Sequence, residues 1–515
     1  MDNLHARCFS LRMFRPIRVL MSLVVGIALL QPVYRFLDVA FARIRYPFEL
    51  EWMEGGIVDH IRVVLSGHAL YREPSFDFTP FIYAPGYYYV SAVVTKIVGL
   101  GLFAPRLVSL LSILGCFVLL GMWVYKESKN FLAAVVAVGL FAATYGQSAF
   151  WFDLARVDSL FLLFLLAGYS LARFGMSNRH AVYCGILLGC AALTKQVGLV
   201  LALPALGFIA MLAWKRGLWA LGAFAVLLAT TFGLLEVTSH GWFGFYTFRV
   251  PAEHAVDWPR SSSVLLEQFW TPVVPMMLST MAIVLGMAAR ARPLVWAFHA
   301  AWVLCAIGTS LSSILHTGGY PNVLMPAHAA MAMCAGLVFA GAWQTDAVAT
   351  RLTTRLLGRR LFVASVLAIQ LFLLPRINSR DLVPSTDDRA AGQTMLAAIA
   401  ASRGPVWMIS SGYYPYLARG DAVVSHAMAL TDVFKSKQTA IQQHLHNDLV
   451  ARIRSKRFGT IVLDRAAGFL PSDIADEIRQ SYRLKEHIFS PDTGHFWPKC
   501  GAAIRPDEIW EPVGM

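Results

Sequence analysis

Eleven apolar runs constrain the fold of this chain more than any other feature. They cover Val19–Leu37, Ala104–Tyr125, Phe131–Tyr145, Leu154–Phe174, Ala181–Leu193, Val197–Trp214, Leu218–Val237, Pro272–Ala289, Leu294–Leu315, Val323–Trp343 and Leu361–Pro375. A helix needs about 20 apolar residues to cross a bilayer. Of the 515 residues, 57% are hydrophobic and 15% charged, with a mean hydropathy of +0.56, unlike a soluble domain. The sequence predicts an α-helical polytopic membrane protein with about 11 spans.

The basic residues indicate how these spans are oriented. The net charge of +13 is spread in short clusters between the apolar runs, so it does not predict nucleic-acid binding. Cytoplasmic loops carry an excess of Lys and Arg. If Gly86–Phe103 is an interfacial helix and not a span, the clusters fall on the side of the basic N-terminus: Lys126/Lys129, Arg173/Arg179, Lys215/Arg216, Arg290/Arg292 and Arg351/Arg355/Arg359/Arg360. We therefore expect a multi-pass protein of the inner (plasma) membrane with a cytoplasmic N-terminus.

Composition divides the chain into two parts. Residues 1–375 form the predicted transmembrane part, with a large first outer loop at 38–103, and residues 376–515 are ordinary polar sequence. In the second part the β-like runs Val406–Ser410 and Thr460–Asp464 alternate with helix-like stretches such as Gln438–Lys456. That alternation predicts a small C-terminal α/β domain, which we expect outside the membrane.

Three acids near the ends of apolar runs are candidate catalytic groups. Glu51 and Glu54 are three residues apart, so on a helix they would share one face. Paired carboxylates can divide the work of a general base and a metal ligand. Asp158 stands in the first turns of a span, where an unpartnered acid is costly. The alternatives are solvated acids at a helix start, favoured by the helix dipole, and for Asp158 a pairing with Arg156.

Two cations are candidate contacts for a phosphate on the same side. Arg106 opens a span in APRLVSLL, and Lys195 divides two apolar runs in ALTKQVGLVL. A cation at headgroup depth needs an anion, and a phosphate or pyrophosphate supplies one. The alternative is that both side chains extend to the interface without a ligand.

The segment HTGGYPNVLMPAH, from His316 to His328, completes the candidate site. Its Gly and Pro residues disfavour a regular helix, and irregular backbone at membrane depth is tolerated where it lines a cavity. We therefore expect His316, Tyr320 and Asn322 to contact a sugar or phosphate, a simple turn between spans being the alternative. Tyr83 belongs to an aromatic cluster that forms either an interfacial belt or a surface for stacking sugars.

The joint order of these features resembles the GT-C fold glycosyltransferases that use lipid-linked sugars, in the branch of the protein O-mannosyltransferases and lipid A aminoarabinose transferases. MEGGIVDHIRVVLSGHALY resembles the family's "DEG…G…Y" opening, with Glu54 on the second acid and Met53 where the first is expected. FIYAPGYYYVSAVV resembles the stretch that leads into a juxtamembrane helix. Arg106, Asp158 and Lys195 match the family's arginine, second-loop acid and lysine near the lipid phosphate.

The resemblance implies transfer of a sugar from a polyprenyl-phosphate donor to a hydroxyl of a lipid, glycan or protein on the outer face of the membrane. Glu54 or Glu51 would be the base, because Met53 replaces the usual acid. Lys195, Arg106 and His316 would stabilise the leaving phosphate. A divalent metal, Mg²⁺ or Mn²⁺, would bridge Asp158 and that phosphate.

Two other classes remain open from sequence. A transporter or flippase of lipid-linked sugars would also need cations and aromatic residues at the interface, but it predicts broken helices or acids at the bilayer centre. The second class is a structural subunit with a sensory outer domain. For such a protein, neutralising Glu54 and Asp158 together would cause no loss of function.

Overall fold

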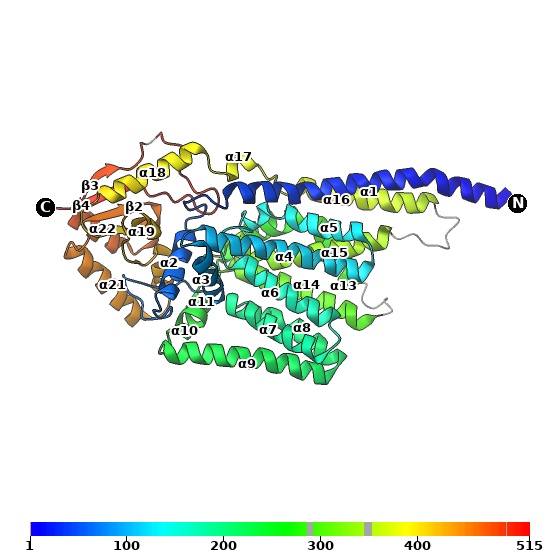
Figure 1. Ribbon diagram of the computed structural model, residues 1–515, viewed down its shortest axis with the longest axis horizontal. Helices are drawn as coiled ribbons and strands as arrows, with labels where there is room; N and C mark the ends of the chain where they lie inside the picture. The colour runs from blue at the N-terminus through cyan, green and yellow to red at the C-terminus, as the bar shows by residue number, and fades with distance from the viewer. Residues whose placement is uncertain (1, 286–291, 344–352, 491, 515) are drawn as a thin grey trace.

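The computed structural model describes residues 2–285, 292–343, 353–490 and 492–514, and Figure 1 shows a helical bundle joined at one end to an α/β domain. The bundle contains α1 (Asp2–Arg43), α4 (Phe103–Ser128), α5 (Phe131–Ala143), α6 (Asp158–Phe174), α7 (Asn178–Thr194), α8 (Gly198–Leu212), α9 (Trp214–Thr238), α13 (Thr271–Leu285), α14 (Pro293–Leu315), α15 (Met325–Trp343) and α16 (Thr353–Leu373). Each predicted apolar run lies on one of these helices, although residues 286–289 fall outside the described part. The predicted helical class is confirmed.

Length and composition separate the bundle helices into two groups. Within the described residues, five helices are long and apolar enough to cross a membrane: Val19–Arg43, Phe103–Ser128, Trp214–Thr238, Pro293–Leu315 and Pro321–Gly341. Four shorter apolar helices lie at Phe131–Ala143, Gly198–Leu212, Pro272–Val284 and Arg360–Leu373. The short helices pack between longer ones, as α5 does against α1, α4 and α15. This is the arrangement of a multi-pass membrane protein.

The predicted basic loops that the structure describes lie at the end of the bundle away from the α/β domain. Lys126 and Arg173 stand in the last turns of α4 and α6, and Lys215 stands at the start of α9. Figure 1 places the N-terminus at this same end and the C-terminus at the other. Arg290 and Arg351 lie outside the described residues. The assignment of this end to the cytoplasm stays a prediction.

The first loop contains two helices, α2 (Glu54–Leu65) and α3 (Gly86–Val98). The helix α1 continues to Arg43, past residue 38, where the sequence predicts that the first outer loop begins. The 13 residues of α3 reach about 20 Å, short of the 30 Å of a hydrocarbon core. On one face of α3, Val93 is 63% and Ile97 80% exposed, whereas Tyr87 and Tyr88 are buried. A short helix with one exposed apolar face suits a position along a membrane surface, and this placement of α3 stays a prediction.

Short helices connect the bundle on the side of the α/β domain. They are η1 (Gly146–Ser148), α10 (Trp242–Gly244), η2 (Phe245–Arg249), α11 (Val250–Glu253), α12 (Trp258–Ser263), η3 (Val264–Trp270) and η5 (Pro321–Leu324). Backbone bonds tie two of these connections together, since Asp257 donates to the Leu315 carbonyl at 2.9 Å and Thr317 to the Ala255 carbonyl at 2.9 Å. The segment around His316 is thereby held against the connection that follows α11.

The C-terminal part is built on a four-stranded sheet. It contains α17 (Ser379–Leu382), α18 (Thr386–Ala401), β1 (Val406–Met408), α19 (Tyr413–Arg419), α20 (Ala427–Phe434), α21 (Thr439–Arg454), β2 (Thr460–Leu463), η6 (Arg465–Phe469), α22 (Ser472–Ser481), β3 (Tyr482–His487) and β4 (Glu508–Pro512). The strand order is β1-β2-β4-β3, with β1 and β2 parallel and the other pairs antiparallel. The two predicted β runs are β1 and β2, and the predicted helix at Gln438–Lys456 is α21.

Aromatic contacts join the first loop to the C-terminal domain. The ring of Phe76 packs edge-on against Trp407 of β1 at 5.1 Å between centroids. The ring of Phe48 packs against Phe496 at 5.2 Å. All four side chains are buried, and aromatic pairs of this kind contribute about 0.5–1.5 kcal/mol beyond their area burial. The first loop and the C-terminal domain therefore form one packed unit.

Labelling of introduced cysteines tests whether α3 crosses the membrane. The exposed positions His68, before α3, and Lys129, after α4, should react with an impermeant maleimide from opposite sides of the membrane, since only α4 crosses between them. We expect Arg483→Cys in β3 to react from the same side as His68→Cys. Labelling is compared in intact cells and inverted vesicles against the unsubstituted protein. Reaction of His68→Cys and Lys129→Cys from the same side would mean that α3 is a span.

Candidate active site

A cavity of about 460 Å³ lies between the bundle and the C-terminal domain. Its lining includes six of the predicted site residues: Glu51, Tyr83, Lys195, His316, Tyr320 and Asn322. Met428, Asp432, Lys435 and Phe469 line it from the C-terminal domain. The volume is within the range of ligand sites in proteins. Segments that are distant in sequence are thus brought together around one hollow.

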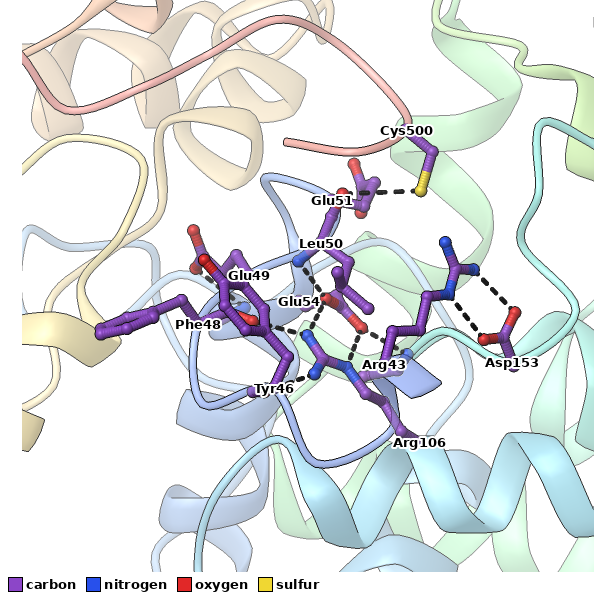
Figure 2. A network of polar contacts seen from close by, with 12 residues as sticks. Arg43, Tyr46, Phe48, Glu49, Leu50, Glu51, Glu54, Arg106, Asp153 and Cys500 are labelled. Atoms are coloured by element: carbon purple, nitrogen blue, oxygen red, sulfur yellow. Dashed lines mark hydrogen bonds and ion pairs between the residues drawn. The ribbon is translucent and has the colours of Figure 1, made fainter. Parts of the chain in front are cut away.

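Glu54 and Arg106 form a buried ion pair away from this cavity. Figure 2 shows the Arg106 guanidinium contacting both carboxylate oxygens of Glu54, at 2.9 and 2.6 Å. The carboxylate also accepts hydrogen bonds from the backbone N–H groups of Leu50 (2.7 Å) and Ala155 (2.9 Å). Burial tends to raise the pKa of Glu54, but Arg106 and these N–H groups hold it below its usual value. Glu54 is therefore a fully engaged carboxylate that positions the chain around it.

The remaining donors of the Arg106 guanidinium contact backbone carbonyl groups. Its guanidinium donates to the carbonyl of Tyr46 at 2.6 Å and to that of Phe48 at 2.7 Å. Arg106 is 0% exposed and does not line the cavity. The sequence predicts this arginine as a phosphate contact, whereas in the structure its donors are directed to Glu54 and to the backbone that leads to Glu51.

Glu51 occupies the turn before α2, so the expectation that Glu51 and Glu54 share a helix face is wrong, because α2 begins only at Glu54. The Glu51 side chain lines the cavity and is 0% exposed. Its Oε2 accepts long contacts from Met53 N (3.3 Å) and Arg156 Nη1 (3.4 Å), and its buried Oε1 has no hydrogen-bond partner in the described part of the chain. Burial, opposed by Arg156, raises the pKa of Glu51 to about 7.

Glu49 is a third acid of this turn, and it faces the C-terminal domain. Its carboxylate accepts hydrogen bonds from Gly55 N at 3.0 Å and Ser411 Oγ at 2.9 Å. A Cβ atom at Gly55 would lie 2.0 Å from Glu49 Oε1, which explains why glycine is needed there. Burial raises the pKa of Glu49 well above its usual value. Glu49 does not line the cavity.

Arg156 is a cavity residue that the sequence analysis treats only as a partner for Asp158. Its guanidinium contacts Glu51 and donates to Tyr83 Oη at 3.1 Å. The guanidinium also lies 4.4 Å from the centroid of the Trp151 ring, and its buried Nε has no hydrogen-bond partner among the residues described. Asp153, three residues before Arg156, is instead held by Arg43 (Figure 2). The sequence cannot distinguish these pairings because both acids lie within three residues of Arg156.

Asp158 is the first residue of α6, and it pairs with Lys195. Lys195 Nζ lies 2.6 Å from Asp158 Oδ1, and both residues line a small hollow with Asn322 beside the main cavity. Within the described residues, no group of three or more His, Cys, Asp or Glu side chains is arranged so that it could hold a metal ion. These donors do not fit a metal held by protein side chains alone, and the predicted Mg²⁺ or Mn²⁺ at Asp158 stays a prediction.

The segment after α14 lines the same cavity as Glu51. The Tyr320 ring stacks on Trp151 with 5.0 Å between centroids and 27° between planes. His316 Nδ1 is buried and has no hydrogen-bond partner in the part of the chain that is described. The Trp151 ring thus contacts both the Tyr320 ring and the Arg156 guanidinium. These contacts link the segment after α14 to the arginine beside Glu51.

The C-terminal domain supplies a wall that the sequence analysis does not assign to the site. Asp432 of α20 is buried, and burial raises its pKa to about 7. His254 Nε2 lies 3.6 Å from Asp432 Oδ1, and Lys435, the residue that follows α20, also lines the cavity. In the sequence, Asp432 and Lys435 are an acid and a lysine three residues apart. This spacing is common on solvated helix surfaces, so it does not indicate a site.

Gly501 closes the cavity over Glu51. Its φ angle is +81°, and a Cβ atom there would lie 2.7 Å from Glu51 Cγ. The neighbouring Cys500 N donates to the Leu50 carbonyl at 3.1 Å, which ties this segment to the turn that holds Glu51. The backbone near the end of the chain therefore contributes to the shape of the site without a side chain.

Comparison with known proteins identifies the fold. No family model matches the chain, and no curated protein matches it in sequence. It is similar to the structure of ArnT from Cupriavidus metallidurans in the apo state, with 13% identity and a TM-score of 0.57 over 93% of this chain and 97% of that chain. For ArnT bound to undecaprenyl phosphate the identity is 14% and the TM-score 0.55, over 94% and 99%. The predicted GT-C fold is confirmed.

Replacement of Arg106 tests its role as a buried clamp. Arg106→Leu would leave the Glu54 carboxylate buried without its cation, so we expect a loss of about 3–5 kcal/mol in the free energy of unfolding. The measurement is the thermal midpoint and denaturant stability of the purified protein in detergent. Arg45→Leu is the control, because Arg45 is exposed. Replacing both charges, as Glu54→Gln with Arg106→Met, should recover part of the loss, and an unchanged midpoint for Arg106→Leu would contradict the clamp.

Proposed function

We propose that the chain is an integral-membrane glycosyltransferase that moves a sugar from a polyprenyl-phosphate donor to an acceptor hydroxyl on the outer face of the membrane. The observation that carries this proposal is a single cavity lined by a buried acid, Glu51, and by the cations Lys195 and Arg156. The likeness in fold to ArnT, solved with undecaprenyl phosphate, supports a polyprenyl phosphate as the carrier.

Glu51 is the general base in this proposal. A pKa of about 7 makes a carboxylate a stronger base than usual and leaves much of it ionised near neutral pH. The acceptor oxygen attacks the anomeric carbon while its proton passes to Glu51. The bond from that carbon to the phosphate oxygen breaks, and the electron pair leaves with the phosphate. Glu54 is unsuited to this role, because its four hydrogen bonds stabilise the ionised form.

Cations on the cavity wall would stabilise the leaving phosphate. Lys195 supplies a point charge whose position is held by Asp158 at 2.6 Å. Arg156 offers its buried Nε, which has no hydrogen-bond partner among the described residues, and the His316 ring also faces this cavity. In a site with few waters such charges act strongly on the charge that develops in the transition state. Tyr83, Tyr320 and Asn322 would orient the sugar.

The acceptor remains a lipid, a glycan or a protein hydroxyl in this proposal. Its binding would involve the wall from the C-terminal domain, where Asp432, Lys435 and Phe469 line the cavity. The alternative of a transporter or flippase of lipid-linked sugars predicts movement of the donor without a new glycosidic bond. The gathering of Glu51, Arg156 and Lys195 at one end of the bundle favours the transferase.

Neutralising Glu51 should abolish transfer without unfolding the protein. For Glu51→Gln we expect at least about 100-fold slower transfer, the usual contribution of a general base. Because the ionised form is the base, wild-type kcat/KM should rise about tenfold per pH unit below pH 7 and level off above it. Its raised pKa means that ionised Glu51 destabilises the fold above its unfolded pKa, so the glutamine variant should not lower the thermal midpoint.

The assay combines purified protein, a radiolabelled polyprenyl-phosphate sugar and a membrane extract. Glu49→Gln is the matched control, because Glu49 is a partly buried acid two residues away that does not line the cavity, and it should retain transfer. Asp158→Asn should be impaired, since Lys195 loses its partner. Wild-type rates for Glu51→Gln would disprove its role as base. Donor translocation by the wild type with no glycosylated product would favour the flippase.

A side chain at position 501 should displace Glu51. In Gly501→Ala the new Cβ would meet Glu51 Cγ, so transfer should fall at least tenfold, as expected when a catalytic group moves by about 1 Å. Gly420→Ala is the control, because Gly420 has a similar φ of +75° and nothing within 4 Å of the added atom. Both variants carry the same backbone strain of roughly 1–2 kcal/mol. Equal transfer rates in the two variants would show that Glu51 tolerates the shift.

A further inference from the structure

A second cavity, of about 350 Å³, lies between α1, α5 and the end of α16. Its lining contains two arginines, Arg35 of α1 and Arg376 just after α16, together with Gln31. Arg35 Nη1 donates to the Ile377 carbonyl at 3.0 Å, which holds the two helix ends together. The residues that line the main cavity do not include any of these side chains, so this is a separate site.

The surroundings of this cavity are apolar and face outward. On α1, Ile27 is 69% and Tyr34 68% exposed, and on α16 Ile369 is 52% and Phe372 78% exposed. In a membrane these side chains would contact lipid, because both helices belong to the apolar bundle. Placing two arginine side chains among side chains that face lipid costs free energy unless an anion pairs with them. A membrane lipid can bring that anion.

The cavity lies toward the ends of α1 and α16. Arg376 follows the end of α16 at Leu373, beyond the apolar helix. Arg35 stands eight residues before the end of α1 at Arg43, about 12 Å along the helix. This end of both helices is nearest the C-terminal domain (Figure 1). Asp38, one turn beyond Arg35, accepts a hydrogen bond from Ser379 Oγ at 2.9 Å.

The backbone adds an acceptor to the two cations. Pro32 lies inside α1 and has no N–H group, so it cannot bond to the carbonyl of Ala28. Both Pro32 and Ala28 line the cavity. A guanidinium pair suits a phosphate, and a carbonyl freed from the helix suits a hydroxyl. The combination fits a phosphodiester with a hydroxyl-bearing headgroup, such as a glycerol.

We propose that this cavity binds the phosphate headgroup of an anionic membrane lipid, with Arg35 and Arg376 as its cationic contacts. The proposal does not depend on the glycosyltransferase activity. The lipid would fasten α1 to the end of α16 at the side of the bundle.

Native mass spectrometry of the full chain in detergent, with added lipid, tests this site. The probes are phosphatidylglycerol, phosphatidylcholine and inorganic phosphate. We expect the wild type to bind phosphatidylglycerol at least tenfold more tightly than phosphatidylcholine. Arg376→Gln and Arg35→Gln should each weaken that binding roughly tenfold, the effect of one charge-assisted hydrogen bond. Arg45→Gln is the matched control, because Arg45 is an exposed arginine near the same end of α1 that does not line the cavity.

Each outcome decides the proposal. Equal binding of the two lipids by the wild type, or equal losses for Arg376→Gln and Arg45→Gln, would overturn it. Displacement of phosphatidylglycerol by millimolar inorganic phosphate would identify a site for a free anion and would overturn the lipid assignment. Arg35→Gln loses the contact with Ile377 and could fail to fold for that reason. In that case two measurements still test the proposal: the comparison of Arg376→Gln with Arg45→Gln, and the preference of the wild type for phosphatidylglycerol.

Discussion

The buried ion pair of Glu54 and Arg106 is the interaction on which the rest of the site depends. It joins the start of α2, the first turn of α4 and the carbonyls of residues 46 and 48. Taking two charges out of water is costly, and here the cost is offset because every oxygen of the carboxylate has a donor. This pair holds the turn between residue 48 and α2 through the contacts with residues 46, 48 and 50, and Glu51 of that turn lines the cavity.

Two acids three residues apart therefore acquire opposite properties. Glu54 is surrounded by donors, and its pKa lies below the usual value. Glu51 is buried among few donors, and ionised Glu54 nearby adds to the burial that raises its pKa to about 7. When the environment separates the pKa values of two carboxylates, the two can have different roles. Here Glu54 stabilises the local structure, and Glu51 is the proposed group for proton transfer. The scaffold pair thus tunes the acid that it positions.

Much of this organisation is visible in the sequence, and the missing parts have physical reasons. The apolar runs predicted the bundle helices because an apolar run of that length has few alternatives to a helix in a membrane. The strands β1 and β2 were predicted because they are buried along their length, whereas in β3 only Tyr482 is buried and RLKEH shows no apolar alternation. The partners of Arg156 and Arg106 could not be predicted. The sequence shows where each arginine stands along the chain, but not which acid its guanidinium contacts.

The C-terminal domain is part of the site as well as a cover for it. It contributes Asp432 of α20 and the following Lys435 to the cavity, and Gly501 approaches Glu51 so closely that a side chain has no room. The aromatic clusters of the first loop pack on β1 and on the segment near Phe496, so the turn that carries Glu51 is held from both sides. A change in this domain can therefore alter the position of the proposed base and the wall that an acceptor would meet, without any change in the bundle.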